Sequence, residues 1–252
     1  MTRRACLFVI PLAIFAAGVS ARSSSDAARR TGLGVDVSRL EGKINWRRAA
    51  ASGIGFAIVE ASRGSGSDCT VKPKRCGADP FYAANYAQAR DAGIRVGPYH
   101  RAFVNGATRR GAIADAKAEA DLFAARVGKL NRGDLLPALD VEPPYDGVSA
   151  SRLRLWVQMW LDRVGGRLGV KPMIYTSASG WQGTGDTTRF ARTGHRLWVA
   201  HWGVQSPSVP AGDWAGHGWA VWQFTNDRRV PGIKGLPDAD RLGVPLAQIS
   251  VH

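Results

Sequence analysis

The stretch Leu139-Asp140-Val141-Glu142-Pro143, which closes the apolar run Leu135-Leu136-Pro137-Ala138, decides how the rest of this sequence is interpreted. It predicts a buried β-strand whose last residues carry two carboxylates at positions i and i+2. Side chains two apart on a strand project from the same face, with Cα atoms about 6.5–7 Å apart. Two acids at the C-terminal end of a strand are typical of glycosidic bond cleavage, in which one carboxyl group donates a proton while the other stays charged.

Strand-like runs alternate with helical patterns around this stretch. Besides the carboxylate-bearing run, we expect strands at 33–38, 56–61, 94–100, 172–176, 197–202, 219–224 and 239–242. We expect helices at 46–52, 81–92, 112–127 and 153–168, and no long helix after residue 177. The pattern therefore predicts an α/β fold, an irregular TIM-like barrel of about eight strands with helices mainly in the first five β/α units.

The N-terminal residues are predicted to lie outside this fold. Residues 1–21 have a basic start, Met1-Thr2-Arg3-Arg4, an apolar run at 6–19 and small residues at Val19-Ser20-Ala21. This organisation predicts a cleaved secretory signal peptide, with an uncleaved N-terminal anchor as the alternative. Residues 22–31, rich in Ser, Ala and Arg, are predicted to be a flexible leader. Residues 32–252 are then expected to form one catalytic domain, and the protein is expected to be periplasmic or extracellular.

The charge and the cysteines fit an exported protein. The chain has 34 Lys and Arg against 20 Asp and Glu, a formal net charge of +14, which favours an anionic surface such as the bacterial envelope. The bases are scattered and form no nucleic-acid motif, so we expect no nucleic-acid partner. Cys69 and Cys76 are predicted to form a disulfide, because an even pair remains after removal of Cys6 with the signal. We expect no metal site and no cofactor.

Further acids and aromatic residues lie at strand ends. Asp36 lies near the end of the first expected strand, and Asp238 follows the turn-rich segment 232–237. Charged residues at the C-terminal strand ends of a barrel indicate catalysis, although Asp36 alone could equally cap a turn. Three aromatic residues near such ends could stack on sugar rings: Tyr99, Tyr175 and Trp222. For Trp198 and Trp219 the barrel core is the preferred interpretation. His100 and His201 are interpreted as hydrogen-bonded strand-end residues rather than ligands.

Six motifs between about residues 33 and 243 occur together in the order seen in one enzyme family. They are Gly34-Val35-Asp36-Val37-Ser38, Gly97-Pro98-Tyr99-His100, Leu139-Asp140-Val141-Glu142, Ile174-Tyr175-Thr176-Ser177, Trp222-Gln223-Phe224, and Val230-Pro231-Gly232-Ile233 leading to Asp238. In these motifs the chain resembles glycoside hydrolase family 25, the lysozymes of the Chalaropsis type, which cut bacterial peptidoglycan.

This resemblance implies an irregular eight-stranded barrel that hydrolyses the β-1,4 bond between N-acetylmuramic acid and N-acetylglucosamine. It implies that Glu142 is the general acid and that Asp140 orients the substrate's acetamido group or stabilises the oxocarbenium-like centre. Asp36 and Asp238 would be supporting carboxylates. Family members have been discussed as retaining enzymes, and the spacing of the two acids does not decide between retention and inversion. The expected partner is the peptidoglycan glycan strand, bound by a monomer.

Some positions depart from the family pattern. Leu40-Glu41-Gly42 stands where Trp-Gln-Gly is usual, and Arg63 stands where an acid is usual. Trp202, which we include among the substrate-binding residues, stands where many members have Tyr, and Asp240 stands where Asn is common. These departures bear on substrate preference rather than on the acid pair. Two alternative functions remain: an inactive glycan-binding barrel, and a chitinase-like hydrolase of N-acetylglucosamine polymers.

Overall fold

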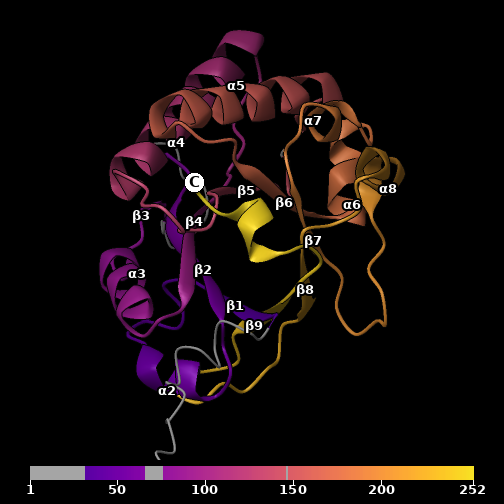
Figure 1. The fold of residues 1–252 in the computed structure, drawn as a ribbon. Helices are drawn as coiled ribbons and strands as arrows, with labels where there is room; N and C mark the ends of the chain where they lie inside the picture. The colour runs from indigo at the N-terminus through magenta and orange to yellow at the C-terminus, as the bar shows by residue number, and fades with distance from the viewer. Residues whose placement is uncertain (1–31, 66–75, 146) are drawn as a thin grey trace, which may run out of the picture.

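Strand β1 (Leu33–Val37) pairs with both β2 (Phe56–Arg63) and β9 (Asp238–Leu242), and this double pairing closes the sheet into a barrel (Figure 1). The computed structural model describes residues 32–65, 76–145 and 147–252. The strands between β2 and β9 are β4 (Arg95–Arg101), β5 (Ala138–Asp140), β6 (Met173–Ser177), β7 (Leu197–Ala200) and β8 (Val221–Thr225). Each pair of neighbours from β1 round to β8 is parallel, whereas β9 is antiparallel to both of its neighbours.

The expected barrel of about eight strands is confirmed, and one short strand was not expected. Strand β3 (Gly77–Ala78) pairs only with the end of β2 and lies outside the closed ring. The carboxylate-bearing strand is shorter than expected, since β5 ends at Asp140. Pro137 just before β5 has no N–H to donate to a ladder, which limits the strand at its start. Val141 N still donates to Tyr175 O, at 2.9 Å, so the backbone after Asp140 stays beside β6.

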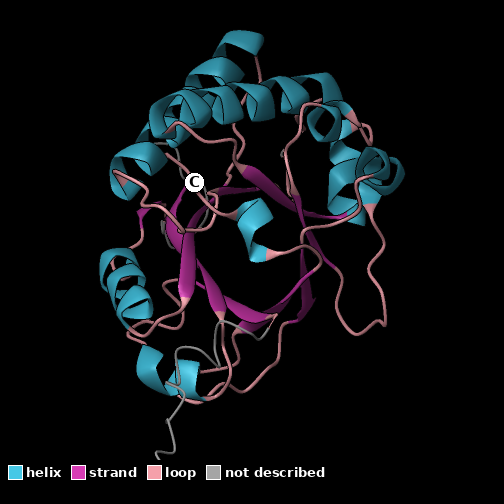
Figure 2. Cartoon of the chain, in the orientation of Figure 1, coloured by secondary structure: helices cyan, strands magenta, loops and turns pink. Residues whose placement is uncertain are grey.

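The α-helices lie around the outside of the barrel, whereas the 3-10 turn near the C-terminus lies across its opening in this view (Figure 2). Four helices follow the early strands, at the expected places: α2 (Trp46–Ala51), α3 (Tyr82–Asp91), α4 (Arg109–Val127) and α5 (Ala150–Leu168). After β6 the helices are short: α6 (Ala178–Trp181), α7 (Arg189–Arg192) and α8 (Pro210–Gly216), with 3-10 turns at Gln182–Thr184 and Leu246–Ile249. Within the described residues, no helix has the length and apolar character to cross a membrane.

Helix α5 shows why the long helices form against the barrel. Its buried side chains recur at spacings of three and four residues and make one apolar stripe: Leu153, Trp156, Val157, Trp160, Leu161 and Val164. Helix α4 packs beside it and begins at Thr108, whose hydroxyl accepts a hydrogen bond from Gly111 N at 3.0 Å. Gly169, in a left-handed conformation with φ 70°, ends α5.

The alternation of side chains along the strands separates an inner core from an outer one. Phe56, Ile58, Met173 and Trp198 fill the barrel interior with both tyrosines of the motifs, Tyr99 and Tyr175. The outer core, between strands and helices, holds most of the remaining large side chains, among them Trp46, Phe123, Trp156, Trp160 and Trp181. The core position of Trp198 is therefore confirmed. Above the inner core, the same alternation directs polar side chains into the C-terminal end of the barrel.

Candidate active site

The C-terminal end of the barrel holds carboxyl groups from several strands. Asp36 comes from β1, Glu60 from β2, Asp140 from β5, and Asp238 and Asp240 from β9. All except Asp238 are buried. Burial penalises the charged form of a carboxyl group unless cations or hydrogen-bond donors compensate it. The partners of each acid therefore determine what this end of the barrel can do chemically.

Asp140 and Glu142 share a single cation, Arg101, at the end of β4. Arg101 Nη1 lies 3.1 Å from Asp140 Oδ2 and also contacts Glu142 Oε2. The side chain of Asp140 is 6% exposed, whereas those of Glu142 and Arg101 are 24% and 28% exposed. The structure thus brings the two sequence-predicted acids together, with Glu142 as the member that reaches solvent. The sequence interpretation missed Arg101, although its place two residues after Tyr99 on the same strand face was a usable signal.

Burial dominates the proton affinity of this pair. It raises the pKa of Asp140 to about 8, although Arg101 opposes the shift, and the charge of Glu142 raises the pKa further. At neutral pH Asp140 therefore keeps a proton that an ordinary aspartic acid would lose. The buried Oδ1 of Asp140 has no hydrogen-bond partner among the described residues.

Gln223, on β8, organises the opposite side of the mouth. Its Nε2 donates to Asp36 Oδ2 at 2.8 Å and to Asp238 Oδ2 at 3.1 Å. Its Oε1 accepts from Tyr175 OH at 3.0 Å and from Trp202 Nε1 at 2.9 Å. One amide therefore fixes both supporting acids and two of the aromatic residues. The sequence shows the motif that contains Gln223, but the role of Gln223 in binding these acids and aromatic residues was not predicted from it.

No cation contacts the acids on this side among the described residues. Asp240 Oδ1 accepts from Trp198 Nε1 at 2.7 Å, and Asp240 Oδ2 is buried without a hydrogen-bond partner in the described part of the chain. Burial raises the pKa of Asp240 to about 8 and that of Asp238 to about 6. The pKa of Asp36 is well above its ordinary value because of burial and the neighbouring charges of Asp240 and Asp238. This side therefore retains protons that free aspartic acids would lose.

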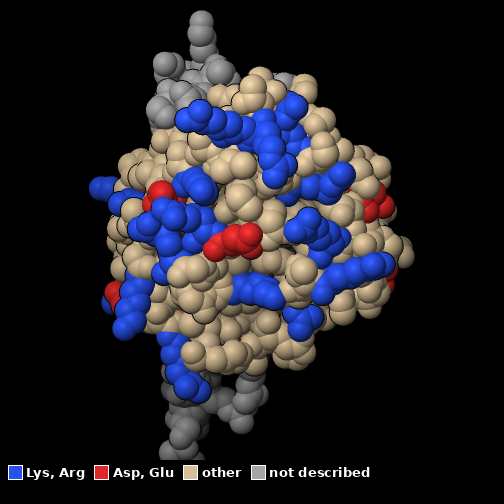
Figure 3. Space-filling view, turned by 90° about the horizontal axis from the view of Figure 1, so that it is seen from above, with Lys and Arg blue, Asp and Glu red and all other residues tan. Residues whose placement is uncertain are grey.

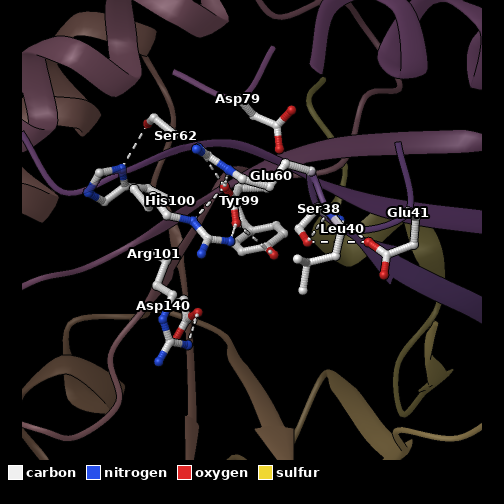
Figure 4. A network of polar contacts seen from close by, with 12 residues as sticks. Ser38, Leu40, Glu41, Glu60, Ser62, Asp79, Tyr99, His100, Arg101 and Asp140 are labelled. Atoms are coloured by element: carbon white, nitrogen blue, oxygen red, sulfur yellow. Dashed lines mark hydrogen bonds and ion pairs between the residues drawn. The ribbon is translucent and has the colours of Figure 1, made fainter. Parts of the chain in front are cut away.

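Glu60 forms a separate ion cluster beside the acid pair (Figure 4). It is fully buried, and Arg39 Nη2 lies 3.2 Å from its Oε1 while Arg63 contacts both of its oxygens. Tyr99 OH donates to Glu60 Oε2 at 3.4 Å. The departure at Arg63 thus has a structural explanation, because its charge is balanced by an acid three residues earlier on the same strand. Glu60 was missed in the sequence, where an acid ending an apolar strand was the available signal.

The histidines take no part in the mouth. His100 points out of the barrel, where Ser62 Oγ lies 2.8 Å from Nδ1 and Glu119 Oε2 lies 2.7 Å from Nε2. All three side chains are buried, and burial lowers the pKa of His100 to about 3 and raises that of Glu119 to about 8. His201 Nδ1 accepts from Ser208 N. The described residues contain no cluster of three or more His, Cys, Asp or Glu suited to a metal ion.

The aromatic residues expected to bind sugar differ in position. Trp202 is 48% exposed and presents a ring at the mouth, while Tyr99 and Tyr175 are buried and present mainly their hydroxyl groups. Trp222 is 4% exposed and packs in the outer core against Trp219, on the face of β8 opposite to Gln223. The expected stacking role of Trp222 is therefore corrected, because strand alternation turns its ring away from the mouth.

Two short rim segments complete the mouth. Leu40, which stands where the family pattern has Trp, follows β1 and is 68% exposed, and Leu236, just before β9, is 47% exposed. Glu41 turns back to Ser38, whose backbone N donates to its Oε2 at 2.7 Å (Figure 4). Apolar contact area therefore remains at this part of the rim, on side chains that cannot stack as an indole does.

A family model, related sequences and a solved structure all match this chain over most of its length. The model of the family "Glycosyl hydrolases family 25" matches residues 35–233. Lysozyme M1 of Streptomyces globisporus is 32% identical over 240 residues, which cover 92% of this chain and 75% of the relative. The N,O-diacetylmuramidase of Arthroderma benhamiae is 30% identical, over 90% of this chain and 91% of the relative. The crystal structure of a bacterial lysozyme from Streptomyces coelicolor has a TM-score of 0.73 at 32% identity, over 86% of this chain and 94% of that one.

Asp240 is buried and contacts no cation among the described residues, so the stability of the folded protein is expected to depend on pH. Asp240→Asn is expected to raise the free energy of unfolding at pH 8 by about 1–3 kcal/mol and to change it little at pH 4. The pKa of Asp240 in the folded protein, about 8, lies above the ordinary value of 3.8. The folded chain therefore keeps a proton that the unfolded chain loses between these values, and stability falls as pH rises. An asparagine side chain does not titrate, so it adds no such pH dependence to the free energy of unfolding.

Urea unfolding of both proteins at several pH values between 4 and 8 measures this effect. Asp162→Asn, which changes an exposed acid on α5, is the matched control and is expected to show no such pH-dependent difference. A loss of stability in Asp240→Asn that is equal at pH 4 and pH 8 would contradict the assignment of a proton to Asp240.

Proposed function

This chain belongs to glycosyl hydrolase family 25, and from that membership we propose that it hydrolyses the β-1,4 bond between N-acetylmuramic acid and N-acetylglucosamine in bacterial peptidoglycan. It is a glycoside hydrolase of the lysozyme type. The observation that carries the bond-level proposal is the Asp140–Glu142 pair, two carboxyl groups at the barrel mouth that contact one guanidinium group.

The roles within the pair follow from exposure. Glu142 is the more exposed carboxyl group, so we assign it delivery of the proton to the leaving glycosidic oxygen. Delivery of that proton leaves the Glu142 carboxylate negatively charged beside the developing oxocarbenium-like centre. Asp140 is the buried member, and its unpartnered Oδ1 is an acceptor suited to an N–H of the substrate's acetamido group.

The remaining groups at the mouth support the substrate. Asp36 and Asp238, both held by Gln223, are proposed to be hydrogen-bonding partners for sugar hydroxyls on the side opposite to Glu142. Trp202 is proposed to stack on a sugar ring, since an exposed indole offers a flat apolar face. Tyr99 and Tyr175 act from below by fixing Glu60 and Gln223.

Export of the protein remains a proposal. The signal peptide at 1–21 and the leader at 22–31 lie outside the described residues, and so does Cys69 of the proposed Cys69–Cys76 disulfide. The proposed partner besides the glycan is the anionic envelope surface, bound by a monomer. Supporting this, bases spread over the face that carries α4 and α5 (Figure 3). The exposed bases on these helices and within three residues of their ends are Arg109, Arg110, Lys117, Lys129, Arg163, Arg167 and Lys171.

Mass spectrometry of digested peptidoglycan tests the function. Residues 22–252 are expected to release muropeptides with new N-acetylmuramic acid reducing ends. Glu142→Gln is expected to lower the rate by at least about 100-fold, because an amide of the same shape cannot donate this proton. Asp140→Asn, with the same change of charge, is the companion variant. Circular dichroism of each variant checks the fold.

The two alternative functions predict different outcomes of this experiment. Intact glycan that still retains the protein would favour a binding barrel. Cleavage of N-acetylglucosamine oligomers in preference to peptidoglycan would favour a chitinase-like enzyme. An active Glu142→Gln variant would overturn the assignment of the general acid while leaving the reaction itself in place.

Fractionation of cells that express the full chain tests export and envelope binding together. The protein is expected outside the cytoplasm, with a mass that corresponds to residues 22–252, and a high salt concentration is expected to release it from the wall fraction. A cytoplasmic protein that retains residues 1–21 would contradict export. A salt-resistant association of the processed protein would contradict binding through its positive charge.

A further inference from the structure

We propose that Arg101 is a positioning residue of the reaction, which holds the carboxyl group of Glu142 beside that of Asp140 in the geometry of proton delivery. This inference rests on the proposed function and concerns the same site. A positioning role differs from that of a purely structural ion pair, because kcat and the pH profile then depend on Arg101.

The sheet fixes the position of Arg101. In the parallel ladder of β4 and β5, Arg101 lies directly opposite Asp140, and Ala102 N donates to Asp140 O at 2.9 Å. The guanidinium group therefore approaches Asp140 from a neighbouring strand and not from a loop. Its Cζ lies 5.9 Å from the centroid of the Phe103 ring, a cation–π contact that restricts the side chain further.

The contact to Glu142 has a different character. Glu142 lies beyond the end of β5, so the strand ladder does not fix its position. Arg101 Nη1 reaches both Oδ2 of Asp140 and Oε2 of Glu142, and so joins a residue held by the sheet to one that is not. Without this cation, no ion pair among the described residues would hold the Glu142 carboxyl group beside Asp140, and the partly exposed Glu142 side chain would be free to turn to solvent.

Other charges at the mouth cannot replace Arg101. Arg39 and Arg63 contact Glu60, and among the described residues no other Lys or Arg makes an ion pair with Asp140 or Glu142. Titratable groups also face the pair from the other elements around it. They are Glu60 on β2, Tyr99 on β4, Tyr145 after β5, Tyr175 on β6, and Asp36 and Asp238 on β1 and β9. All of these are neutral or negative, so Arg101 supplies the positive charge for the pair.

The pH dependence follows from this arrangement. The charge of Arg101 lowers the pKa of Asp140, while burial and Glu142 raise it. Loss of the charge moves the pKa of Asp140 further upward, so Asp140 keeps its proton to higher pH. The limb of the pH–rate profile that reports Asp140 is therefore expected to move to higher pH when Arg101 is replaced by a neutral side chain.

Kinetics of three variants on a soluble peptidoglycan fragment test the inference. For Arg101→Met we expect a kcat about 100-fold lower, a KM within about threefold of wild type, and the Asp140 limb of the kcat/KM profile about one pH unit higher. For Arg101→Lys we expect the wild-type pH profile and a kcat between those of the wild type and Arg101→Met. An ammonium group restores the charge but contacts two carboxyl groups less well than a guanidinium group does. Arg167→Met, which removes an exposed partner of Asp121 on α5, is the control and is expected to match wild type.

The outcomes separate this inference from the proposed function. If the wild type hydrolyses the fragment and Arg101→Met has an unshifted pH profile with an unchanged kcat, the inference is wrong and the function stands. A wild type that hydrolyses no glycan would overturn both. If Arg101→Met does not fold, Arg101→Lys decides, since a shifted pH profile in that variant contradicts a role carried by the charge.

Discussion

The burial of several carboxyl groups at one end of a closed barrel is the constraint on which the rest of this structure depends. Each buried acid must be neutralised by a proton, by a cation or by hydrogen-bond donors. Glu60 is neutralised by Arg39 and Arg63, and Asp140 and Glu142 share Arg101. The acids from β1 and β9 have no cation contact among the described residues and rely on Gln223, Trp198 and retained protons.

This distribution divides the mouth into two halves with different chemical character. In the half built from β2, β4 and β5, every acid contacts an arginine. The half built from β1, β8 and β9 is a hydrogen-bonded acid cluster. Its groups are better suited to hydrogen bonding with the hydroxyl and amide groups of a sugar than to proton transfer during the reaction. A glycosidase needs both, because one set of groups handles the proton while another holds the ring during the reaction.

Much of the fold could be predicted from the sequence, because apolar runs with period two and helices with period 3.6 are local signals. The pair Asp140 and Glu142 was equally local, since two acids end one apolar run. What could not be predicted depends on contacts between strands. Gln223 acquires its role from three other strands, and Trp222 faces outward because of the register of β8. Arg101 is significant only because the β4–β5 ladder sets it opposite Asp140.

The proposed chemistry depends most directly on the proton that Asp140 retains at neutral pH in the free protein. A carbon-13 NMR titration of the aspartate side-chain carboxyl groups, with Asp140 assigned by comparison with Asp140→Asn, measures this directly. The Asp140 resonance is expected to titrate with a pKa near 8. Titration of that resonance below about pH 5, in the range of an ordinary aspartic acid, would show that Asp140 is ionised at neutral pH and would contradict the retention of its proton.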